Sequence, residues 1–562
     1  MSWRPVLLTA LGLALALPAQ GDTIAGEDPT QAADVAAYNA WFADYRVGAF
    51  RLVKNDSTDD AALAHIDALM AKIAQWNTLD AAKLLFLAAS VDPRPGTTGS
   101  STELIDFYRE LQPWKVRGLA ARHLRGMDGD GILTWLLNML STPGIRAAKQ
   151  NQDQLDAAAV LRVLAGHKSL EARAELLRAC HTMPTELRVR AVNAMAADAT
   201  IELVPTLIEL LRDSEPNVRI AACNAIGTAM QPHVDETLGL QPTAETLAVR
   251  DQAIAALAKV AERDRVWQAR SAAAFGLAIM RCKPVIPALI GALDKELGRT
   301  KDPWAMDVRL HKLLEGLTGQ SVVRGSIKPW REFWKREGAS FRVAKAAKPG
   351  EERAKSNRYE KFFDLEIESD RVLFVIDFSG SMVEPITLQQ TATGAPAGKE
   401  LTKAQLVVQE LKKMIMSFPD GAMLNIIVFS DDIRIWRSEA GRPTLVKIDD
   451  DARDDLLGSF LDGLRPAGPT NLHDALALAL DFGGRGLFDK YYAAAFDTLY
   501  VISDGAPSAG PVIDKEEIRR LVREANNLRK ITINCITMGQ QNDTEFLREM
   551  AEENGGRHIH IE

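Results

Sequence analysis

The stretch RVLFVIDFSGS at residues 371–381 decides the fold of the C-terminal part of the chain. Its first seven residues form an almost continuous apolar run, which a strand buried on both faces of a parallel sheet requires. The polar residues Asp377, Ser379 and Ser381 follow where this strand ends. Ligands of open parallel sheets bind beyond the carboxyl ends of the strands, so these three side chains lie where binding is expected. Gly380 permits a tight turn between the serines.

Strand and helix patterns alternate on the C-terminal side of this stretch. This alternation predicts an α/β domain with a mostly parallel, doubly wound, Rossmann-like sheet. The expected strands are 423–430, 432–436, 498–503, 531–538 and 558–561, and the expected helices are 402–417, 452–463, 472–481, 515–528 and 543–553.

Two further segments add oxygen-bearing side chains at comparable places. GPTNLHDALALAL at 468–480 puts Thr470 on a loop just before a helix, and VISDGAPSAG at 501–510 puts Asp504 at the end of another buried strand. With the residues after the first strand they supply two carboxylates and three hydroxyls. Such hard oxygen ligands suit Mg²⁺, Ca²⁺ or Mn²⁺ and not Zn²⁺.

These motifs resemble the von Willebrand factor A (VWA) domain and its metal-ion-dependent adhesion site (MIDAS). The carrying features are DxSxS after an apolar strand, G-x-T-N-x-x-x-A-L, and a strand ending in SDG, in that order. The resemblance covers residues 369–562 and continues through INCITMG at 533–539 and FLREMAEENGGRHIHI at 546–561. A polar loop, PITLQQTATGAPAGKE, is longer than the family's usual connection and borders the expected metal face.

The resemblance implies a role for each site residue. Ser379, Ser381 and Thr470 would coordinate the metal through their hydroxyls, while Asp377 and Asp504 would hold coordinated waters or contact the metal directly. Neutral hydroxyls leave the charge of Mg²⁺ poorly neutralised, so the ion attracts an outside carboxylate. A partner protein that presents an Asp or Glu is therefore expected.

Three histidines lie near this region, and each has two interpretations. His473 could be an extra metal ligand, but we expect a solvent-facing helix residue. His558 and His560 share one face of the last strand and could form a metal pair, yet an ordinary edge strand is favoured because no third ligand is near in sequence.

A helical repeat precedes this domain. Helices that begin with Arg and small apolar residues recur as VRGLAARHL at 116–124, VRAVNAM at 189–195, VRIAACNAIG at 218–227, ARSAAAFGLA at 269–278 and, more weakly, VRLHKLLEGL at 308–317. Leu-rich helices lie between the copies. The pattern resembles HEAT repeats and predicts an all-α solenoid over 112–340, closed by Trp330, Phe333 and Trp334.

The repeated arginines allow two interpretations. They could form a ligand-binding ladder, but hydrogen bonds from one repeat to the next, for example to Asp213 or Glu215, are favoured. A helical region at 30–110 is expected before the solenoid, and a charged linker at 341–368 after it.

The first residues predict export. Arg4 precedes an apolar run of roughly a dozen residues, which is short for a membrane span, and small residues at 19–21 suit a signal peptidase, so residues 1–21 are expected to be a cleaved signal peptide. An uncleaved anchor is the alternative. The protein would then be periplasmic, in the cell envelope or secreted. The four cysteines are far apart and are expected to be small buried hydrophobes, although a disulfide stays open.

The sequence as a whole favours a binding protein over an enzyme. The formal net charge of −8 shows no basic surplus, which argues against a nucleic-acid partner. The alternative is a Mg²⁺-dependent phosphohydrolase, since a strand-end Asp and Mg²⁺ also serve phosphoryl chemistry. Against it, residue 379 is Ser and not a second Asp, and neither GxxxxGK[ST] nor GxSxG occurs. A structural solenoid with an idle appended domain is the third possibility.

Overall fold

The structure is a computed structural model of the 562-residue chain. It describes residues 29–50, 52–54, 57–58, 60–91, 93, 111–147, 151–167, 169–197, 200–299, 304–320, 322, 324–343, 362–363, 365, 367–386, 401–439, 441–480, 494–539 and 544–561. The expected signal peptide at 1–21 lies outside these residues, as does much of the expected linker. No helix in the described ranges has both the length and the apolar character that a membrane span requires.

The described residues between 29 and 343 are mainly helical. The helices are α1 (Pro29–Val47), α2 (Asp60–Gln75), α3 (Leu79–Ser90), α5 (Pro113–Arg125), α6 (Ile132–Ser141), α7 (Pro143–Ala147), α8 (Asn151–Ala165), α9 (Leu170–Thr182), α10 (Thr185–Ala197), α11 (Val204–Leu210), α12 (Pro216–Val234), α13 (Ala244–Arg263), α14 (Trp267–Ile279), α15 (Val285–Leu297), α16 (Met306–Thr318) and α17 (Lys328–Glu337). Short additions are the 3-10 turns η1 (Ile201–Leu203) and η2 (Glu236–Leu238) and the antiparallel pair β1 (Val53–Lys54) and β2 (Ser57–Thr58).

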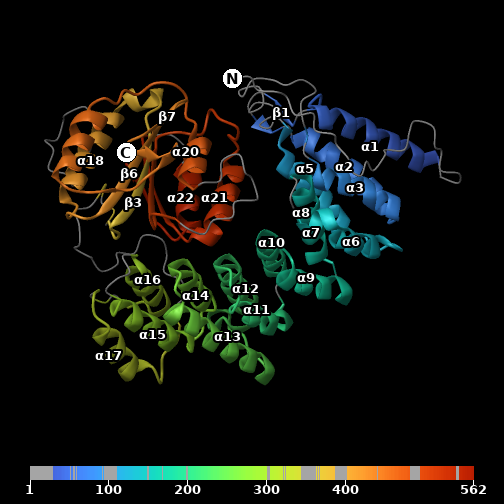
Figure 1. Ribbon diagram of the computed structural model, residues 1–562, viewed down its shortest axis with the longest axis horizontal. Helices are drawn as coiled ribbons and strands as arrows, with labels where there is room; N and C mark the ends of the chain where they lie inside the picture. Colours follow the sequence, from blue (N-terminus) through green and yellow to red (C-terminus); the bar gives the residue numbers. More distant parts are fainter. Residues whose placement is uncertain are drawn as a thin grey trace, which may run out of the picture.

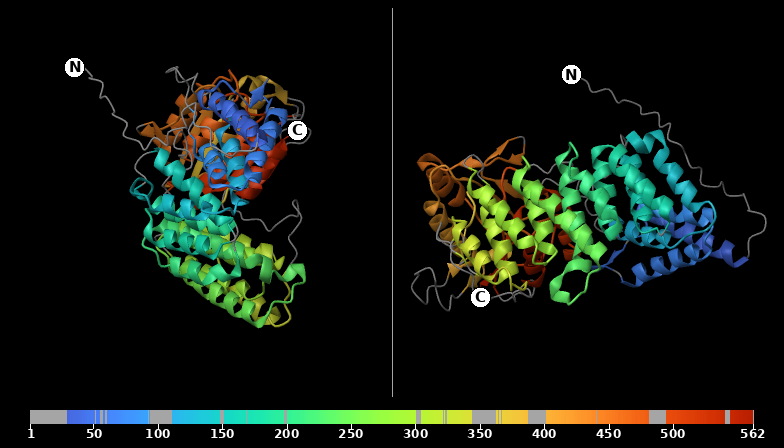
Figure 2. Two further views of the ribbon diagram at one scale, coloured as in Figure 1. Left: turned by 90° about the vertical axis from the view of Figure 1, so that its right-hand side faces the viewer. Right: turned by 90° about the horizontal axis from the view of Figure 1, so that it is seen from below.

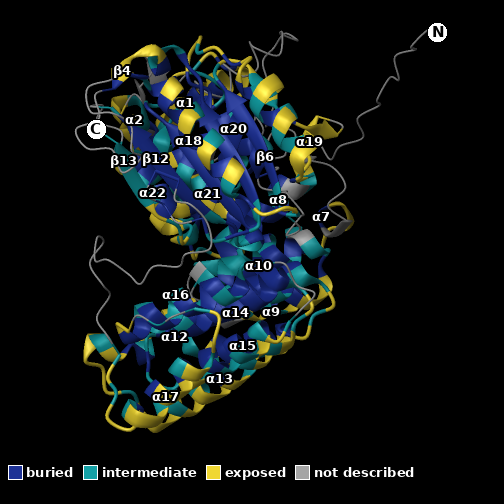
Figure 3. Cartoon of the chain, turned by 90° about the vertical axis from the view of Figure 1, so that its left-hand side faces the viewer, coloured by how far each residue is buried: buried dark blue, intermediate teal, exposed yellow. Residues whose placement is uncertain are grey.

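The helices stack in two rows along a bent path, as a solenoid does (Figures 1 and 2). The helices with the repeated Arg motif form the inner row, in which α10 packs on α12, α12 on α14 and α14 on α16. The Leu-rich helices α11, α13 and α15 form the outer row. Figure 3 shows α14 largely buried, whereas α13 and α17 expose an outer face. The all-α solenoid prediction is confirmed.

Two glycines let neighbouring inner helices approach closely. A Cβ on Gly227 of α12 would lie 2.7 Å from the Cα of Gly276 on α14, and a Cβ on Gly276 would lie 2.7 Å from the carbonyl oxygen of Cys223. Both glycines belong to copies of the repeated motif. Small residues in the motif therefore set the spacing of the inner row.

Two of the repeated arginines, Arg219 and Arg270, link one repeat to the next, as the second interpretation of them predicted. Arg219 at the start of α12 donates two hydrogen bonds to Asp264 (2.8 and 2.9 Å). Buried Arg270 of α14 pairs with Glu296 at 2.6 Å. Asp213 pairs with Arg188, which lies two residues before the motif arginine of α10. At the end of the solenoid, Trp330 and Phe333 of α17 are buried in the same core, which agrees with the predicted cap.

The C-terminal part is a sheet with helices on both faces. Its elements are β3 (Arg371–Asp377), η3 (Gly380–Val383), β4 (Pro385–Ile386), β5 (Leu401–Thr402), α18 (Lys403–Ser417), β6 (Met423–Phe429), β7 (Ile433–Ile435), β8 (Ser438–Glu439), β9 (Arg442–Pro443), β10 (Val446–Lys447), α19 (Asp450–Asp454), the π-helical η4 (Asp455–Leu461), α20 (Leu472–Ala479), β11 (Thr498–Ser503), α21 (Lys515–Arg529), β12 (Thr532–Met538), α22 (Thr544–Glu553) and β13 (His558–Ile561).

Within the described residues the main sheet has the strand order β10-β6-β3-β11-β12-β13, and β7 pairs with β6. The strands from β6 to β13 are parallel, while β10 and β7 are antiparallel to β6. Alternate residues of β3 face two separate cores. Phe374 packs with α18 and η4, and Val375 packs with α20, α21 and α22. The doubly wound α/β prediction is thus confirmed.

The amino ends of the parallel strands dock on the inner helix row (Figure 1). Asp497, which precedes β11, is fully buried, and its carboxylate accepts hydrogen bonds from the backbone N–H of Ala305 (2.8 Å) and from Ser369 (2.5 Å). Arg309 of α16 donates to the carbonyl oxygens of Asp497 (2.7 Å) and Lys530. The last copy of the repeated motif therefore turns its arginine toward the sheet.

A stack of four side chains crosses the same junction. The guanidinium of Arg309 lies over Trp267 at 5.0 Å, Trp267 stacks on Trp304 at 5.0 Å, and the guanidinium of Arg371 lies over Trp304 at 4.9 Å. Cations over aromatic faces are stabilising, most of all where water is excluded. This stack joins the first residue of β3 to the solenoid.

Further polar contacts extend the junction. Glu368 pairs with Lys312 and Arg324 (2.8 Å) of the solenoid side and with Arg557 (3.3 Å) beside β13. Further along the inner row, Asn224 of α12 donates to Asn527 of α21 (2.8 Å), and Lys115 of α5 pairs with Asp514 at 3.0 Å. The inner row is therefore covered in part by the chain's own α/β domain.

All four cysteines are buried and free. The prediction that they are small buried hydrophobes is confirmed, and the structure has no disulfide bond between any two of them.

Candidate functional site

The carboxyl ends of β3 and β11 bring four of the five predicted site residues together: Asp377, Ser379, Ser381 and Asp504. The two strands are neighbours in parallel register, with Ile376 beside Ile502. Asp377 therefore ends β3 next to Ser503, the last residue of β11, and Asp504 follows directly. Two segments about 126 residues apart in the sequence thus lie side by side and place their polar residues at one edge of the sheet.

Asp377 is fully buried at the base of the site. Its Oδ1 accepts from the backbone N–H of Ser379 (2.8 Å), and its Oδ2 accepts from the hydroxyl of Ser503 (2.6 Å). Burial raises the pKa of Asp377 to about 6, with a smaller contribution from the negative charge of Asp504, although the hydrogen bonds from Ser503 and Ser379 oppose the rise. A cation beside this carboxyl would stabilise its ionised form.

A chain of hydrogen bonds runs from Ser379 to Asp504. The hydroxyls of Ser379 and Ser381 lie 3.1 Å apart, and Ser381 donates to Oδ1 of Asp504 at 2.8 Å. Asp504 is almost completely buried. The two serines and Asp504 thus present oxygen atoms to one another at the rim of the sheet.

The loop with Thr470 lies against the turn after β3. The backbone N–H of Gly380 donates to the carbonyl of Gly468 (2.8 Å), and Ala467 donates likewise to Phe378 (2.9 Å). Thr470 is buried, and its backbone is held on both sides by Ser508. The structure therefore places the Thr470 loop beside the serine turn.

Sequence reasoning missed two residues of this edge, Lys403 and Glu384. Lys403 is the first residue of α18, and its Nζ donates to Oδ2 of Asp504 (2.7 Å) and to Glu384 (2.6 Å). Burial alone would lower the pKa of Lys403, but these hydrogen bonds outweigh burial and raise it. A signal for Lys403 was present, because a lysine in the first turn of a helix opposes the helix dipole and needs a local anion.

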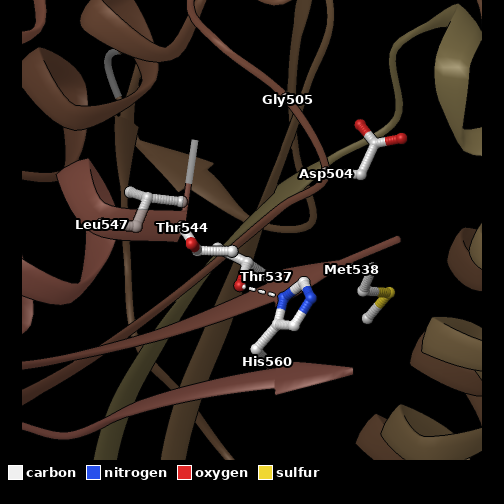
Figure 4. Close-up of a pocket in the computed structure, with 7 residues that line it drawn as sticks. All are labelled: Asp504, Gly505, Thr537, Met538, Thr544, Leu547 and His560. Carbon is white, nitrogen blue, oxygen red and sulfur yellow. Dashed lines mark hydrogen bonds between the residues drawn. The ribbon is translucent and has the colours of Figure 1, made fainter. Parts of the chain in front are cut away.

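A small hollow lies beside Asp504, between the ends of β11 and β12 (Figure 4). Its lining residues are Asp504, Gly505, Thr537, Met538, Thr544, Leu547 and His560. The hydroxyl of Thr537 contacts both His560 (2.9 Å) and His558 (2.8 Å). Burial lowers the pKa of His558 to about 4, and His560 adds to this. Thr537 of β12 thus contacts both histidine rings. The two histidines lie on β13, which pairs with β12 and is an edge strand of the sheet, as expected.

The prediction for His473 was wrong. This residue is buried, not solvent-facing, and its Nδ1 lies 2.8 Å from a carboxylate oxygen of Asp474. Helix α20 packs against β3 and β6, so a side chain at its start is covered by the sheet.

The donor set fits a hard divalent cation. Asp377, Ser379, Ser381, Thr470 and Asp504 offer only carboxylate and hydroxyl oxygens, which Mg²⁺ and related ions prefer. Within the described part of the chain no group of three or more His, Cys, Asp or Glu side chains forms a conventional metal cluster. A cation at this edge would therefore depend on hydroxyls as well as on the two aspartates.

Two family models match the chain. The model for the von Willebrand factor type A domain matches residues 397–559, and the model for HEAT repeats matches residues 174–278. The first match includes Thr470 and Asp504 and begins after the serine turn. No curated protein matches the chain.

Solved structures with similarity cover parts of the chain. A von Willebrand factor type A protein from Catenulispora acidiphila is 19% identical over 34% of this chain and 38% of its own, with a TM-score of 0.26. The PilB minor pilin from Streptococcus sanguinis is 15% identical over 35% of this chain and 58% of its own (TM-score 0.24). The complex of CpcE and CpcF of phycocyanin lyase from Nostoc sp. PCC7120 is 15% identical over 46% and 90% (TM-score 0.20). The chain thus spans less than two thirds of the first two proteins.

Proposed function

Since the chain carries a von Willebrand factor type A domain and HEAT repeats, which indicate a role in protein interaction, we propose that it captures an acidic residue of a partner protein through a divalent cation. Ser379, Ser381 and Thr470 would bind the cation through hydroxyls, with Asp377 and Asp504 as its anionic support. Mg²⁺ is the expected ion, and Ca²⁺ and Mn²⁺ suit the same oxygens.

One observation supports this proposal above the others. Ser379, Ser381 and Asp504 form a continuous hydrogen-bonded set at the carboxyl ends of adjacent strands, over the buried carboxyl of Asp377. These oxygens come from segments more than 120 residues apart and converge at one edge of the sheet. When bound, the cation supplies an open coordination position for an external carboxylate. The protein would act by binding and not by catalysis.

The apolar run near the N-terminus supports a location outside the cytoplasm as part of the same proposal. The partner would then be a protein of the cell envelope or its surroundings.

Titration of the full chain with Mn²⁺, followed by electron paramagnetic resonance of the free ion, tests the metal site. Asp377→Asn should weaken Mn²⁺ binding by about 100-fold, because the buried carboxylate is the main anion at the base of the site. The matched control is Asp462→Asn, which changes an exposed aspartate of the same domain that pairs with Lys412. It should leave the affinity unchanged.

Acetate then tests the open position. Acetate that replaces a metal-bound water should lower the water-proton relaxation of the Mn²⁺-loaded protein. Equal Mn²⁺ affinity in the wild type and Asp377→Asn, or relaxation insensitive to acetate, would contradict the proposal. Release of phosphate from p-nitrophenyl phosphate that depends on Asp377 would instead support the phosphohydrolase alternative.

A further inference from the structure

The strongest feature that the proposed function leaves unexplained is Lys403. Its side chain is 3% exposed, and its ammonium contacts one buried carboxylate, Asp504, and one half-exposed carboxylate, Glu384. Asp504 divides its two oxygens between different partners: Oδ1 accepts from Ser381 and Oδ2 accepts from Lys403. One of the two anions of the candidate metal site is thus already paired with a cation of the chain.

The residues around Lys403 hold its side chain beside Asp504. Lys403 starts α18, where the helix dipole is positive and a lysine is unfavourable, so the carboxylates must offset that cost. Its backbone N–H donates to the carbonyl of Glu384 at 3.0 Å. Gly539 has a positive φ of 85°, and a Cβ there would lie 2.9 Å from the Cε of Lys403 and 3.1 Å from its Nζ. The end of β12 therefore leaves room for this lysine.

We propose that Lys403 is a positioning residue that limits the negative charge of the cation site and so keeps a bound divalent ion receptive to an external carboxylate. The inference rests on the proposed function. Asp377 and Asp504 alone would neutralise a divalent ion completely. The ion, Asp377, Asp504 and Lys403 together carry one net positive charge. Glu384 offsets this charge only in part, because its carboxylate is half-exposed and screened by water, so the loaded site still attracts an acidic partner side chain.

Lys403 should therefore have opposite effects on the affinity for metal and on the affinity of the loaded site for a carboxylate. Lys403 repels the incoming ion and lowers the affinity for metal, while the same positive charge raises the affinity of the loaded site for a carboxylate. A lysine that only held Asp504 in place would act differently, because its removal would loosen a ligand and weaken metal binding.

The test uses the full chain with Mn²⁺ and acetate as probes. Lys403→Gln should bind Mn²⁺ about tenfold more tightly, and its loaded form should bind acetate about threefold more weakly, as expected for loss of one charge close to the ion. Lys403→Arg should stay near the wild type. Lys412→Gln, on the exposed side of the same helix, is the matched control and should change neither affinity. Weaker or unchanged Mn²⁺ binding by Lys403→Gln would overturn the inference.

A second variant covers the case in which Lys403→Gln does not fold. Glu384→Gln alters a half-exposed residue and, among the residues that the structure describes, leaves Asp504 as the carboxylate partner of Lys403. It should weaken Mn²⁺ binding about threefold, because the lysine charge then acts on Asp504 alone. An unchanged affinity would contradict the inference.

Failure of the proposed function can be told apart from failure of this inference. If the wild type does not bind Mn²⁺ but Lys403→Gln does, the metal-capture proposal fails, whereas the effect of the lysine on the site is supported. If neither protein binds Mn²⁺, both are overturned.

Discussion

The two ends of the central sheet do opposite things with the same kind of polar residue. At the amino end, Asp497 is fully buried and saturated, with donors from Ala305 and Ser369 on its carboxylate. At the carboxyl end, Ser379 and Ser381 share hydrogen bonds mainly with each other and with Asp504. One end is closed by the solenoid, and the other presents oxygens that a cation could reorganise.

The comparison shows how the repeat and the sheet divide the work. Arg219 and Arg270 bind acidic residues of the next repeat, but Arg309 in the last copy binds the sheet instead. A β3 strand of seven residues separates the two ends by roughly 20 Å. Substitutions at the amino end of the sheet, which docks on the solenoid, should therefore change stability, and substitutions at the carboxyl end should change cation binding. Each should have little effect on the other property.

Arg309→Met tests the contact between the solenoid and the amino end of the sheet, where the largest effect on stability is expected. The substitution removes donors from the carbonyls of Asp497 and Lys530 and the cation from Trp267, at a cost of about 2 kcal/mol in unfolding free energy after the relief of burying a charge. The urea midpoint of the full chain measures it. Arg122→Met, which loses only an exposed pair with Asp67, should cost about 0.5 kcal/mol or less.

Mn²⁺ affinity is the second measurement on the same variant. It should stay within about twofold of the wild type, since the substitution lies at the far end of the strands. A larger change in affinity would show that the two ends are coupled and that the division of work is wrong.

The sheet was predictable because its strands are buried on both faces. The runs 371–377 and 498–503 were predicted at the bounds that the structure has. The short antiparallel β10 was missed, since two residues carry no periodic signal. Helix 452–463 was predicted as one α-helix, but it is α19 followed by a π-helical segment.

Of the candidate site, the strand-end residues were predictable and their partners were not. Asp377 and Asp504 follow apolar runs, so their positions come from local pattern. Lys403 lies 101 positions from Asp504, and only the closed sheet brings the two together. The docking of Asp497 on the solenoid is equally remote, because its partner Ala305 is 192 positions away. His473 was misplaced since one helical turn does not say which face meets the sheet.

Acid should weaken the docking end through Glu368. Burial would raise the pKa of Glu368, but Lys312 and Arg324 outweigh burial and hold the pKa at about 2, below the ordinary value of 4.5. Because the pKa of Glu368 is lower in the folded state than in the unfolded state, its ionised carboxyl stabilises the folded protein above pH 4.5. This stabilisation is lost as the pH falls from 4.5 toward 2. Between pH 5 and pH 3 the unfolding free energy should therefore lose about 2 kcal/mol through this group.

Glu368→Gln isolates that contribution. Its destabilisation relative to the wild type, measured by urea unfolding, should be largest at pH 5 and smaller at pH 3. A gap that stays constant over this range would show that the charge of Glu368 does not hold the junction, and that Lys312 and Arg324 are satisfied in another way.

The smallest expected effect concerns the outermost contact, between Lys115 of α5 and Asp514. Both side chains are about a quarter exposed, so Lys115→Met should cost about 0.5 kcal/mol or less. Asp514 also caps α21 by accepting from the N–H of Glu517, so Asp514→Ala should cost about 1 kcal/mol more than Lys115→Met. Equal losses in the two variants would mean that the ion pair, and not the cap, holds Asp514. A loss above about 1 kcal/mol for Lys115→Met would extend the firm docking surface from Arg309 to the first helices of the solenoid.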